Sequence, residues 1–284
     1  MSVKIIVDST ADINPAILDR FTVVPLTIRF GDEEYVDGVT ITNQRFYEKL
    51  IESDVLPTTS QATPAAFEDV FRKIADDGDS AVVITLASEL SGTYQSAVVA
   101  AMEYTDRIFV VDSRTVAIGS GVLAEYALRL ADSGMEAETI YKLLLKERDN
   151  VCVVALLDTL EYLKKGGRIS KTVAFTGTML SIKPVVNVKD GKINVLGKAR
   201  GSKQGNNLLA KQIQDFGGFD PEMPVLLGYT GLSDAMLLKY MEDSRYLWEG
   251  KLDHLNTTCL GSVIGTHAGP GAVGAAFFKN RESD

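Results

Sequence analysis

Short apolar segments alternate with amphipathic segments through the first half of the chain. Unbroken apolar runs such as Val3–Val7 are typical of strands that are covered on both faces. The amphipathic segments begin at residues that favour helix starts, including Asn14 before Pro15 and Thr63 before Pro64. The strands that this pattern predicts are Val3–Val7, Thr22–Phe30, Ser80–Leu86 and Arg107–Val111. Three of the helices that it predicts begin at Asn14, Thr42 and Thr63, and two more cover Gly92–Tyr104 and Arg114–Ser133. A polar turn is expected at Asp32–Gly38.

The pattern changes character near Asn150. Two apolar segments, Ile182–Val188 and Lys192–Leu196, flank Lys189-Asp190-Gly191, which is a strong hairpin signal and implies antiparallel pairing. The other elements expected in this half are the strands Val151–Leu157, Pro224–Tyr229 and Leu255–Leu260 and the short helix Leu160–Lys165.

These two patterns predict an α/β protein of two domains. Residues 1–150 are expected to form an N-terminal domain around a mostly parallel, doubly wound sheet. Residues 151–284 are expected to form a C-terminal α/β domain with a mixed or antiparallel sheet. Doubly wound sheets bind ligands at the loops that follow the carboxyl ends of their strands, so we expect a site there.

Composition narrows the classes of function. The chain has 284 residues, 45% of them hydrophobic, which is enough for sizeable cores. Its formal charge of −9 argues against nucleic acid as a partner. We predict a cytoplasmic protein, because no apolar run approaches the ~20 residues of a membrane-spanning helix and the first residues do not read as a signal peptide. Cys152 and Cys259 lie in apolar segments and are expected to be buried free thiols rather than metal ligands.

Hydroxyl and glycine residues cluster where strands end and helices begin. Ser91-Gly92-Thr93 precedes a predicted helix, whose free backbone N–H groups favour an anion. The competing interpretation is that Ser91 only caps the helix. Thr58-Thr59-Ser60, before Thr63, is open to the same two interpretations. Asp8-Ser9-Thr10 follows the first strand without a G-x-G-x-x-G motif, so it either contacts a ligand or pins the turn by local hydrogen bonds.

Two basic residues in the second half are further candidates. Arg200 lies in the cationic segment Lys198–Lys203, which is either a solvated loop or a fork for a carboxylate or phosphate. His267 lies in Gly265–Gly271, within the glycine-rich segment Gly261–Gly274, which is expected to be a loop, and a structural and a functional role for this histidine are both open. The segments therefore fit a small-molecule phosphate binder that uses Gly92 and Arg200.

A hydrolase is a different class of function that the same residues allow. Ser91 would be the nucleophile, His267 the base and Asp8 the carboxylate that orients it. Leu90-Ser91-Gly92 lacks the G-x-S-x-G elbow of α/β hydrolases, which makes an esterase or acyl hydrolase the secondary hypothesis.

Taken in order, the motifs of this chain resemble the DegV family of bacterial fatty-acid-binding proteins, the carrier subunits of a fatty acid kinase system. The resemblance covers almost the whole chain. The matching segments are Asp8-Ser9-Thr10, Pro57-Thr58-Thr59-Ser60-Gln61, Leu90-Ser91-Gly92-Thr93-Tyr94-Gln95-Ser96-Ala97, Leu160–Ile169, Lys183-Pro184, Gly197-Lys198-Ala199-Arg200-Gly201 and Gly265–Gly271.

The resemblance implies a non-catalytic carrier that holds one long-chain, palmitate-like fatty acid in an apolar tunnel, with the carboxylate near the cleft between two domains. It implies that Thr59 and Ser91 hold the carboxylate and that Arg200 and His267 are the basic residues near that end. The other residues expected around the carboxylate are Ser60, Gly92 and Thr93.

The resemblance also implies partners. An ATP-dependent fatty acid kinase would convert the bound carboxylate to an acyl phosphate for phospholipid synthesis, and transient contact with a membrane surface would allow lipid exchange. No metal or other cofactor is implied for this chain, and the nucleotide would belong to the kinase. The absence of a P-loop and of a dinucleotide motif agrees with that division of labour.

Overall fold

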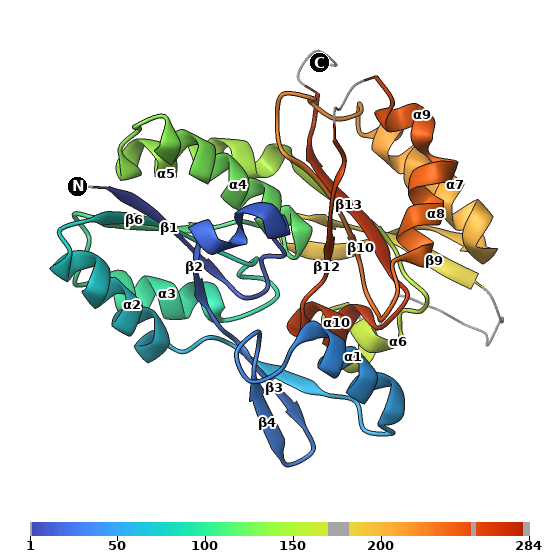
Figure 1. Cartoon of the computed structure of the whole chain (residues 1–284), viewed down its shortest axis with the longest axis horizontal. Helices are drawn as coiled ribbons and strands as arrows, with labels where there is room; N and C mark the ends of the chain where they lie inside the picture. Colours follow the sequence, from blue (N-terminus) through green and yellow to red (C-terminus); the bar gives the residue numbers. More distant parts are fainter. Residues whose placement is uncertain (1, 170–181, 251–253, 281–284) are drawn as a thin grey trace.

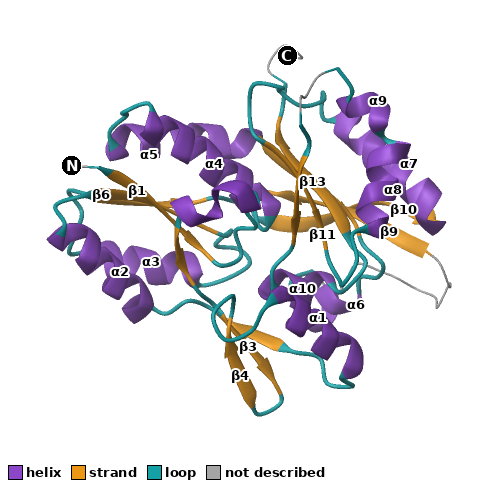
Figure 2. Ribbon diagram, viewed as in Figure 1, coloured by secondary structure: helices purple, strands orange, loops and turns teal. Residues whose placement is uncertain are grey.

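The computed structural model describes residues 2–169, 182–250 and 254–280, whose strands form three sheets (Figures 1 and 2). The strands are β1 (Val3–Asp8), β2 (Thr22–Val24), β3 (Thr27–Phe30), β4 (Glu33–Val36), β5 (Thr58–Ser60), β6 (Ser80–Thr85), β7 (Ile108–Asp112), β8 (Val151–Leu156), β9 (Ile182–Lys189), β10 (Lys192–Arg200), β11 (Val225–Tyr229), β12 (Asn256–Cys259) and β13 (Val273–Phe278). The helices are η1 (Pro15–Arg20), α1 (Asn43–Glu52), α2 (Pro64–Asp76), α3 (Thr93–Ala101), α4 (Ile118–Asp132), α5 (Ala137–Glu147), η2 (Arg148–Asn150), α6 (Glu161–Lys165), α7 (Gly201–Asp215), α8 (Ala235–Asp243), α9 (Arg245–Trp248) and α10 (Ser262–Ala268).

The first sheet is parallel throughout, in the order β2-β1-β6-β7. Helices α2 and α3 cover one face, and α4 and α5 cover the other, so the sheet is doubly wound as the sequence predicts. Because both faces are covered, Ile5, Ile6 and Val7 of β1 are all almost fully buried. The caps also match: the Thr63 side chain accepts a hydrogen bond from the Ala66 N–H, with Pro64 in the first turn.

The second sheet is mixed, in the order β10-β9-β8-β13-β11-β12. Only β11 and β12 pair in parallel, and the β9–β10 hairpin turns at Asp190 and Gly191, both with positive φ, as Lys189-Asp190-Gly191 predicts. Helices α7 and α8 pack on the outer face. Helix α4 packs on the inner face, so that this one helix contacts both large sheets (Figure 1). The fold class expected from the sequence is confirmed.

The third sheet differs from the sequence-based prediction in two ways. Thr22–Phe30 is not one strand, because β2 stays in the parallel sheet while β3 pairs with β4 and β5 in an antiparallel sheet. The break falls at Pro25, which has no N–H to donate to a ladder. The Asp32–Gly38 segment, expected as a polar turn, contains β4.

The second half also differs from expectation in two places. The glycine-rich segment Gly261–Gly274 is not a loop throughout, because it contains α10 and the start of β13. Gly265 lies within α10, where a Cβ would come within 2.6 Å of the Phe46 ring. This glycine therefore serves close packing against α1 rather than a turn. The long helix expected from Arg114 begins only at Ile118, after a loop in which Arg114 and Ala117 have positive φ.

Candidate functional site: an apolar cavity with a polar end

A cavity lies where the inner face of the second sheet meets α10, β5 of the third sheet and the loops that follow β2 and β6 of the first sheet. The space open to the centre of a water-sized sphere is about 120 Å³, roughly ten times what one enclosed water molecule requires. Its walls are mostly apolar, and apolar cavities of this kind favour apolar occupants over water. The cavity is therefore suited to a molecule that is larger than water and largely hydrocarbon.

The apolar wall comes from alternate residues of neighbouring strands. Val153 and Ala155 of β8 line the cavity beside Val186 and Val188 of β9, and Ile193 of β10 continues the surface. Val153 pairs with Val188 and Ala155 with Val186 across the antiparallel ladder. Since side chains of a strand alternate between faces, Val154 of β8 and Val185 of β9 point the other way and pack against the outer helices.

Polar groups gather at one end of the cavity. Thr59 of β5, Ser91 from the loop before α3 and His267 of α10 all line it. The Thr59 Oγ1 and His267 Nε2 atoms are 2.9 Å apart, although the residues are 208 positions apart in the chain. The guanidinium of Arg168, just after α6, lines the same end. Its Nε donates to the Leu90 carbonyl at 3.2 Å and its Nη1 to the Gly166 carbonyl at 2.6 Å.

The position of His267 keeps its imidazole neutral near pH 7. Burial and the neighbouring positive charge of Arg168 lower the pKa of His267 from 6.5 to about 4. The absence of a side chain at Gly166 lets the His267 ring approach the backbone, since a Cβ there would lie 2.3 Å from Nδ1 of His267. Nδ1 is buried and has no hydrogen-bond partner among the described residues. A threonine hydroxyl that is hydrogen bonded to a neutral imidazole can still interact with a polar group placed beside the pair.

Ser91, Gly92 and Thr93 form a compact start to α3. The Thr93 N–H donates to Ser91 Oγ at 3.3 Å, and the two hydroxyl oxygens are 3.0 Å apart. The N-cap of α3 is Gly92, and Ser91, one residue before it, accepts from the first N–H of the helix and also lines the cavity. Thr93 is fully buried behind it. Gly92 lets the Gln61 amide approach, because a Cβ would lie 2.1 Å from Gln61 Oε1.

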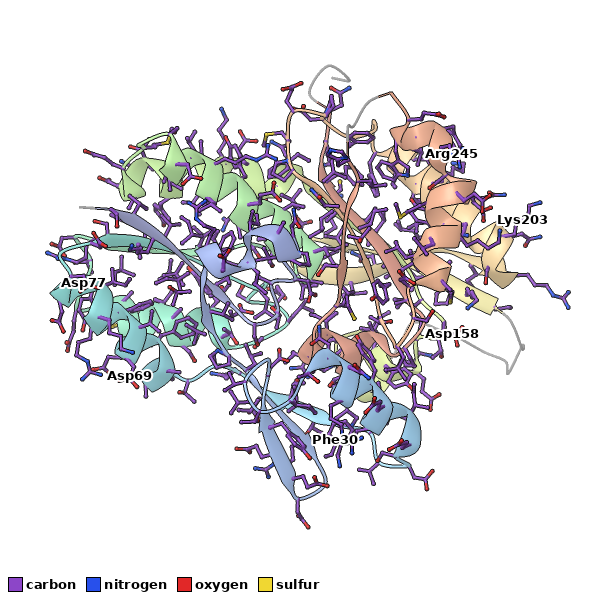
Figure 3. All side chains as sticks on the ribbon, in the orientation of Figure 1. Phe30, Asp69, Asp77, Asp158, Lys203 and Arg245 are labelled. Atoms are coloured by element: carbon purple, nitrogen blue, oxygen red, sulfur yellow. The ribbon has the colours of Figure 1, made fainter. Side chains whose placement is uncertain are left out.

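Not all the candidate residues meet at this end. Ser60 lines the cavity beside Thr59. Arg200 lies at the junction of β10 and α7, where it is exposed and is not among the residues that line the cavity. Its neighbour Lys203 extends outward from the first turns of α7 (Figure 3). The Arg200 segment is thus a basic surface rather than a cavity wall.

Arg168, Gln61 and Asn187 are the cavity-lining polar residues that the sequence did not indicate, although Arg168 and Gln61 lie in segments that matched the family. The signal for Arg168 was the pair Gly166-Gly167 directly before it. A glycine pair beside a short basic helix indicates close backbone approach, and here the group approached is His267.

The residues of a serine hydrolase are not assembled. His267 Nε2 meets Thr59, and Asp8 does not orient the imidazole. Asp8 instead accepts hydrogen bonds from the Thr10 N–H, the Thr10 hydroxyl and the Leu86 N–H. The alternative that Asp8 pins its turn is the one the structure supports.

Three further findings concern the part of the chain that the structure describes. None of its helices has the length and apolar character needed to cross a membrane. None of its groups of His, Cys, Asp or Glu side chains is arranged to hold a metal ion. Cys152 and Cys259 are free thiols, and Cys152 is buried as expected whereas Cys259 is only half-buried; burial raises the pKa of Cys152 to about 11 and also raises the pKa of Cys259. Both cysteines are therefore poor nucleophiles at neutral pH.

Fold and cavity together define an α/β protein of three sheets with a largely apolar cavity. The family model described as "uncharacterised protein, DegV family" matches residues 2–280. A DegV domain-containing protein of Clostridium perfringens is 35% identical over 279 residues, covering 97% of this chain and 98% of the relative. The chain belongs to the DegV family.

Solved structures share the fold over their whole length. A DegV family protein from Thermus thermophilus, described by its fatty acid binding, aligns with a TM-score of 0.87 and 30% identity, covering 99% of this chain and all of the other. A stearic-acid-binding protein from Eubacterium ventriosum aligns with a TM-score of 0.86 and 27% identity, covering both chains completely. A fatty acid binding DegV protein from Bacillus subtilis aligns with a TM-score of 0.82 and 27% identity over 98% of this chain and all of the other.

Proposed function

We propose that this chain binds one long-chain fatty acid of palmitate-like size in the cavity and acts as a carrier rather than a catalyst. The tail lies along the apolar wall of β8 and β9, and the carboxylate lies at the polar end with Thr59, Ser91, Arg168 and His267. The observation that carries the proposal is the combination of a hydrocarbon-lined cavity with hydroxyl and guanidinium donors at one end only. The fatty acid binding described for the structural neighbours supports it.

The energetics favour this orientation of the ligand. Each buried methylene contributes about 0.8 kcal/mol, so a chain of about sixteen carbons gains on the order of 10 kcal/mol before the costs of binding. A carboxylate loses its hydration when it is buried, and donors must replace that water. Because the hydroxyl and guanidinium donors lie at one end, the reversed ligand would leave its charge beside valines and the neutral amide of Asn187. The tail therefore supplies affinity and the polar end sets direction.

The same proposal extends to partners and to the organisation of the chain. Residues 1–150 and 151–284 act as two domains with the lipid site between them, in the cytoplasm. An ATP-dependent fatty acid kinase phosphorylates the presented carboxylate, and the acyl phosphate feeds phospholipid synthesis. Transient contact with a membrane surface exchanges the lipid. The family membership and the basic Arg200 segment on the surface support these steps.

Mass spectrometry of an organic extract of the freshly purified protein tests the proposal. We expect close to one long-chain fatty acid per chain, with no cleavage of ester substrates by the isolated protein. Ester hydrolysis that is lost in Ser91→Ala would support the hydrolase instead. An extract without fatty acid, together with thermal protection by phosphorylated small molecules, would support the phosphate binder.

The kinase step gives a second test. We expect Arg200→Ala to lower the rate of acyl phosphate formation with the kinase about tenfold while fatty acid affinity changes less than twofold, because Arg200 is exposed and lies outside the cavity lining. Arg245→Ala is the matched control, since Arg245 is an exposed arginine on α9 (Figure 3). Equal losses of binding and turnover in Arg200→Ala would contradict the assignment.

A further inference from the structure

The end of the cavity away from Thr59, Arg168 and His267 is bounded by a row of β-branched side chains, with Asn187 beside them. Val153, Val188 and Ile193 are cross-strand neighbours on β8, β9 and β10, and all three line the cavity. On the same wall, Ala155 and then Leu157 lie between Val153 and the polar end. At about 3.3 Å per residue, Val153 and Leu157 are about 13 Å apart along the wall. An extended hydrocarbon advances about 1.3 Å per carbon, from C–C bonds of about 1.5 Å, so this wall accommodates about ten carbons.

The facing wall at this end is the segment Val116–Ile118, which also lines the cavity. Its backbone is strained, because Ala117 has φ 57 and ψ −132, a conformation that residues with a Cβ rarely adopt. Such a conformation persists only where its surroundings impose it. The wall is therefore expected to be stiff.

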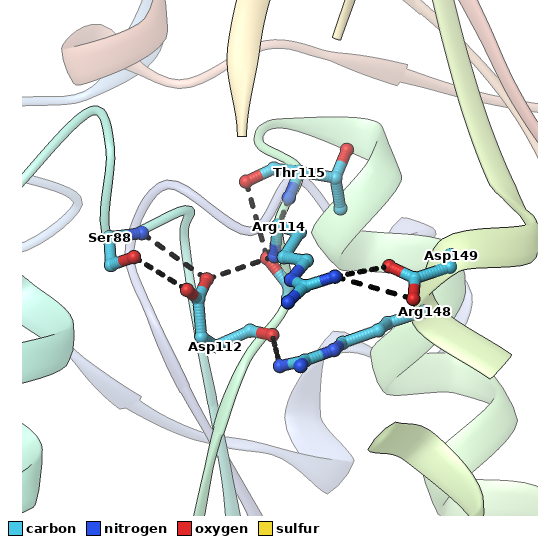
Figure 4. A network of polar contacts seen from close by, with 7 residues as sticks. Ser88, Asp112, Arg114, Thr115, Arg148 and Asp149 are labelled. Carbon is cyan, nitrogen blue, oxygen red and sulfur yellow. Dashed lines mark hydrogen bonds and ion pairs between the residues drawn. The ribbon is translucent and has the colours of Figure 1, made fainter. Parts of the chain in front are cut away.

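A network of polar contacts holds the loop before Ala117 in place (Figure 4). The Asp112 carboxylate accepts hydrogen bonds from the N–H of Arg114 and from both the N–H and the hydroxyl of Ser88. The Arg114 guanidinium pairs with Asp149, and Arg148 donates to the Asp112 carbonyl at 2.7 Å. The Gly191 N–H of the β9–β10 turn donates to the Arg114 carbonyl at 3.0 Å. The loop is thus tied to the same hairpin that carries Val188 and Ile193.

A second pocket lies directly behind the row. Val153, Asn187 and Val188 line both the cavity and this pocket, so they form the partition between them. Charged residues dominate the far side, including Arg114, Arg148 and Lys189. A hydrocarbon chain that crossed the partition would leave an apolar environment for a charged one.

From this arrangement we infer that Val188, paired with Val153, sets the upper limit on acyl chain length. The inference rests on the proposed binding of a fatty acid and identifies the residue that selects among such ligands. The terminal methyl group of the longest accepted chain contacts the Val153–Val188 pair. Removing bulk from Val188 extends the cavity toward the second pocket, and adding bulk shortens it.

Competition binding with unbranched saturated acids from dodecanoic to eicosanoic acid tests the inference on the full-length, delipidated protein. In Val188→Ala, we expect affinity for acids longer than the wild-type optimum to rise relative to palmitate, by about fourfold for each methylene that gains a buried place. Val186→Ala is the matched control, because Val186 is the same residue type on the same strand and face, two positions nearer the polar end. It is expected to keep the wild-type length limit. Val188→Leu is expected to move the limit to shorter acids.

The possible outcomes distinguish a failure of the chain-length inference from a failure of the proposed fatty acid binding. Fatty acid binding by the wild type with an unchanged length profile in both Val188 variants would overturn the inference and leave the proposed function standing. Equal shifts in Val188→Ala and Val186→Ala would also overturn it, because general loosening would then explain the change. Absence of fatty acid binding by the wild type would remove the proposed function and the inference with it.

Discussion

Replacement of Arg168 by Met lowers fatty acid affinity by between about 10-fold and 150-fold in our expectation, the range that corresponds to one lost hydrogen bond to a charged group. Arg168 places a guanidinium at the polar end of the cavity, held there by donation to the carbonyls of Leu90 and Gly166. Met preserves the length and apolar stem of the side chain while removing its charge. The bound carboxylate would then keep only neutral partners. Isothermal titration of the delipidated protein with palmitate measures the change.

Two further variants sharpen this test. Arg168→Lys keeps the charge but cannot reproduce a planar fork that reaches two carbonyls, so an intermediate loss is expected. Thr59→Ala removes one neutral partner of the carboxylate and should cost less than Arg168→Met. Affinity within twofold of the wild type in Arg168→Met, in a protein with native circular dichroism, would show that the carboxylate lies elsewhere.

Acidification destabilises the delipidated protein through His267. The folded pKa of His267 is about 4 against 6.5 for an unperturbed histidine, so between these values the unfolded chain binds the proton and the folded chain does not. Histidine is charged when it is protonated, so its lowered pKa in the folded state makes the folded protein resist protonation. The contribution of His267 to the free energy of unfolding is therefore fully present above about pH 6.5 and falls as the pH decreases toward 4. The contribution lost between pH 7 and pH 5 is about 2 kcal/mol.

Urea unfolding of wild type and His267→Gln at both pH values measures this effect. Glutamine can still hydrogen bond to Thr59 but does not titrate, so we expect the wild type to lose about 2 kcal/mol more than the variant. Taking the difference removes the effect of the buried Asp8, Asp12 and Asp37, whose raised pKa values favour the folded state at low pH. His254→Gln changes an exposed histidine and should behave as wild type. Parallel pH dependence in wild type and His267→Gln would contradict the buried neutral imidazole.

Local sequence patterns determined the order and type of most elements. The apolar runs of β1 and β6 indicated strands covered on both faces, and both are buried in a parallel sheet. Thr63-Pro64 marked a helix start, and Lys189-Asp190-Gly191 marked a hairpin, because caps and tight turns depend on a few adjacent residues. The family motifs are short segments that occur in a fixed order along the chain, so the sequence alone indicated the DegV family, which the family model confirms.

The elements that the sequence did not reveal depend on distant partners. Strand β13, with the sequence VGAAFF, has small residues and a preceding glycine run, and it is a strand because β8 and β11 pair with it on either side. Strand β5, only three residues long, exists because β3 leaves the first sheet after Pro25 and offers it an edge. Neither pairing has a signature within the segment itself.

The residues of the candidate site were likewise visible in the sequence in part, and their mutual contacts only in the structure. The sequence by itself supplied the hydroxyl, histidine and glycine motifs, since these residue types in short segments are recognisable without a structure. Only the tertiary structure decided that Thr59 meets His267, that Arg168 joins them, and that Arg200 lies on the surface. It also decided which valines face a cavity and which face each other, because packing and ligand binding use the same apolar side chains. The contact between Thr59 and His267, 208 positions apart, is set by how α10 packs on β3, β5 and α1, and no local pattern encodes that packing.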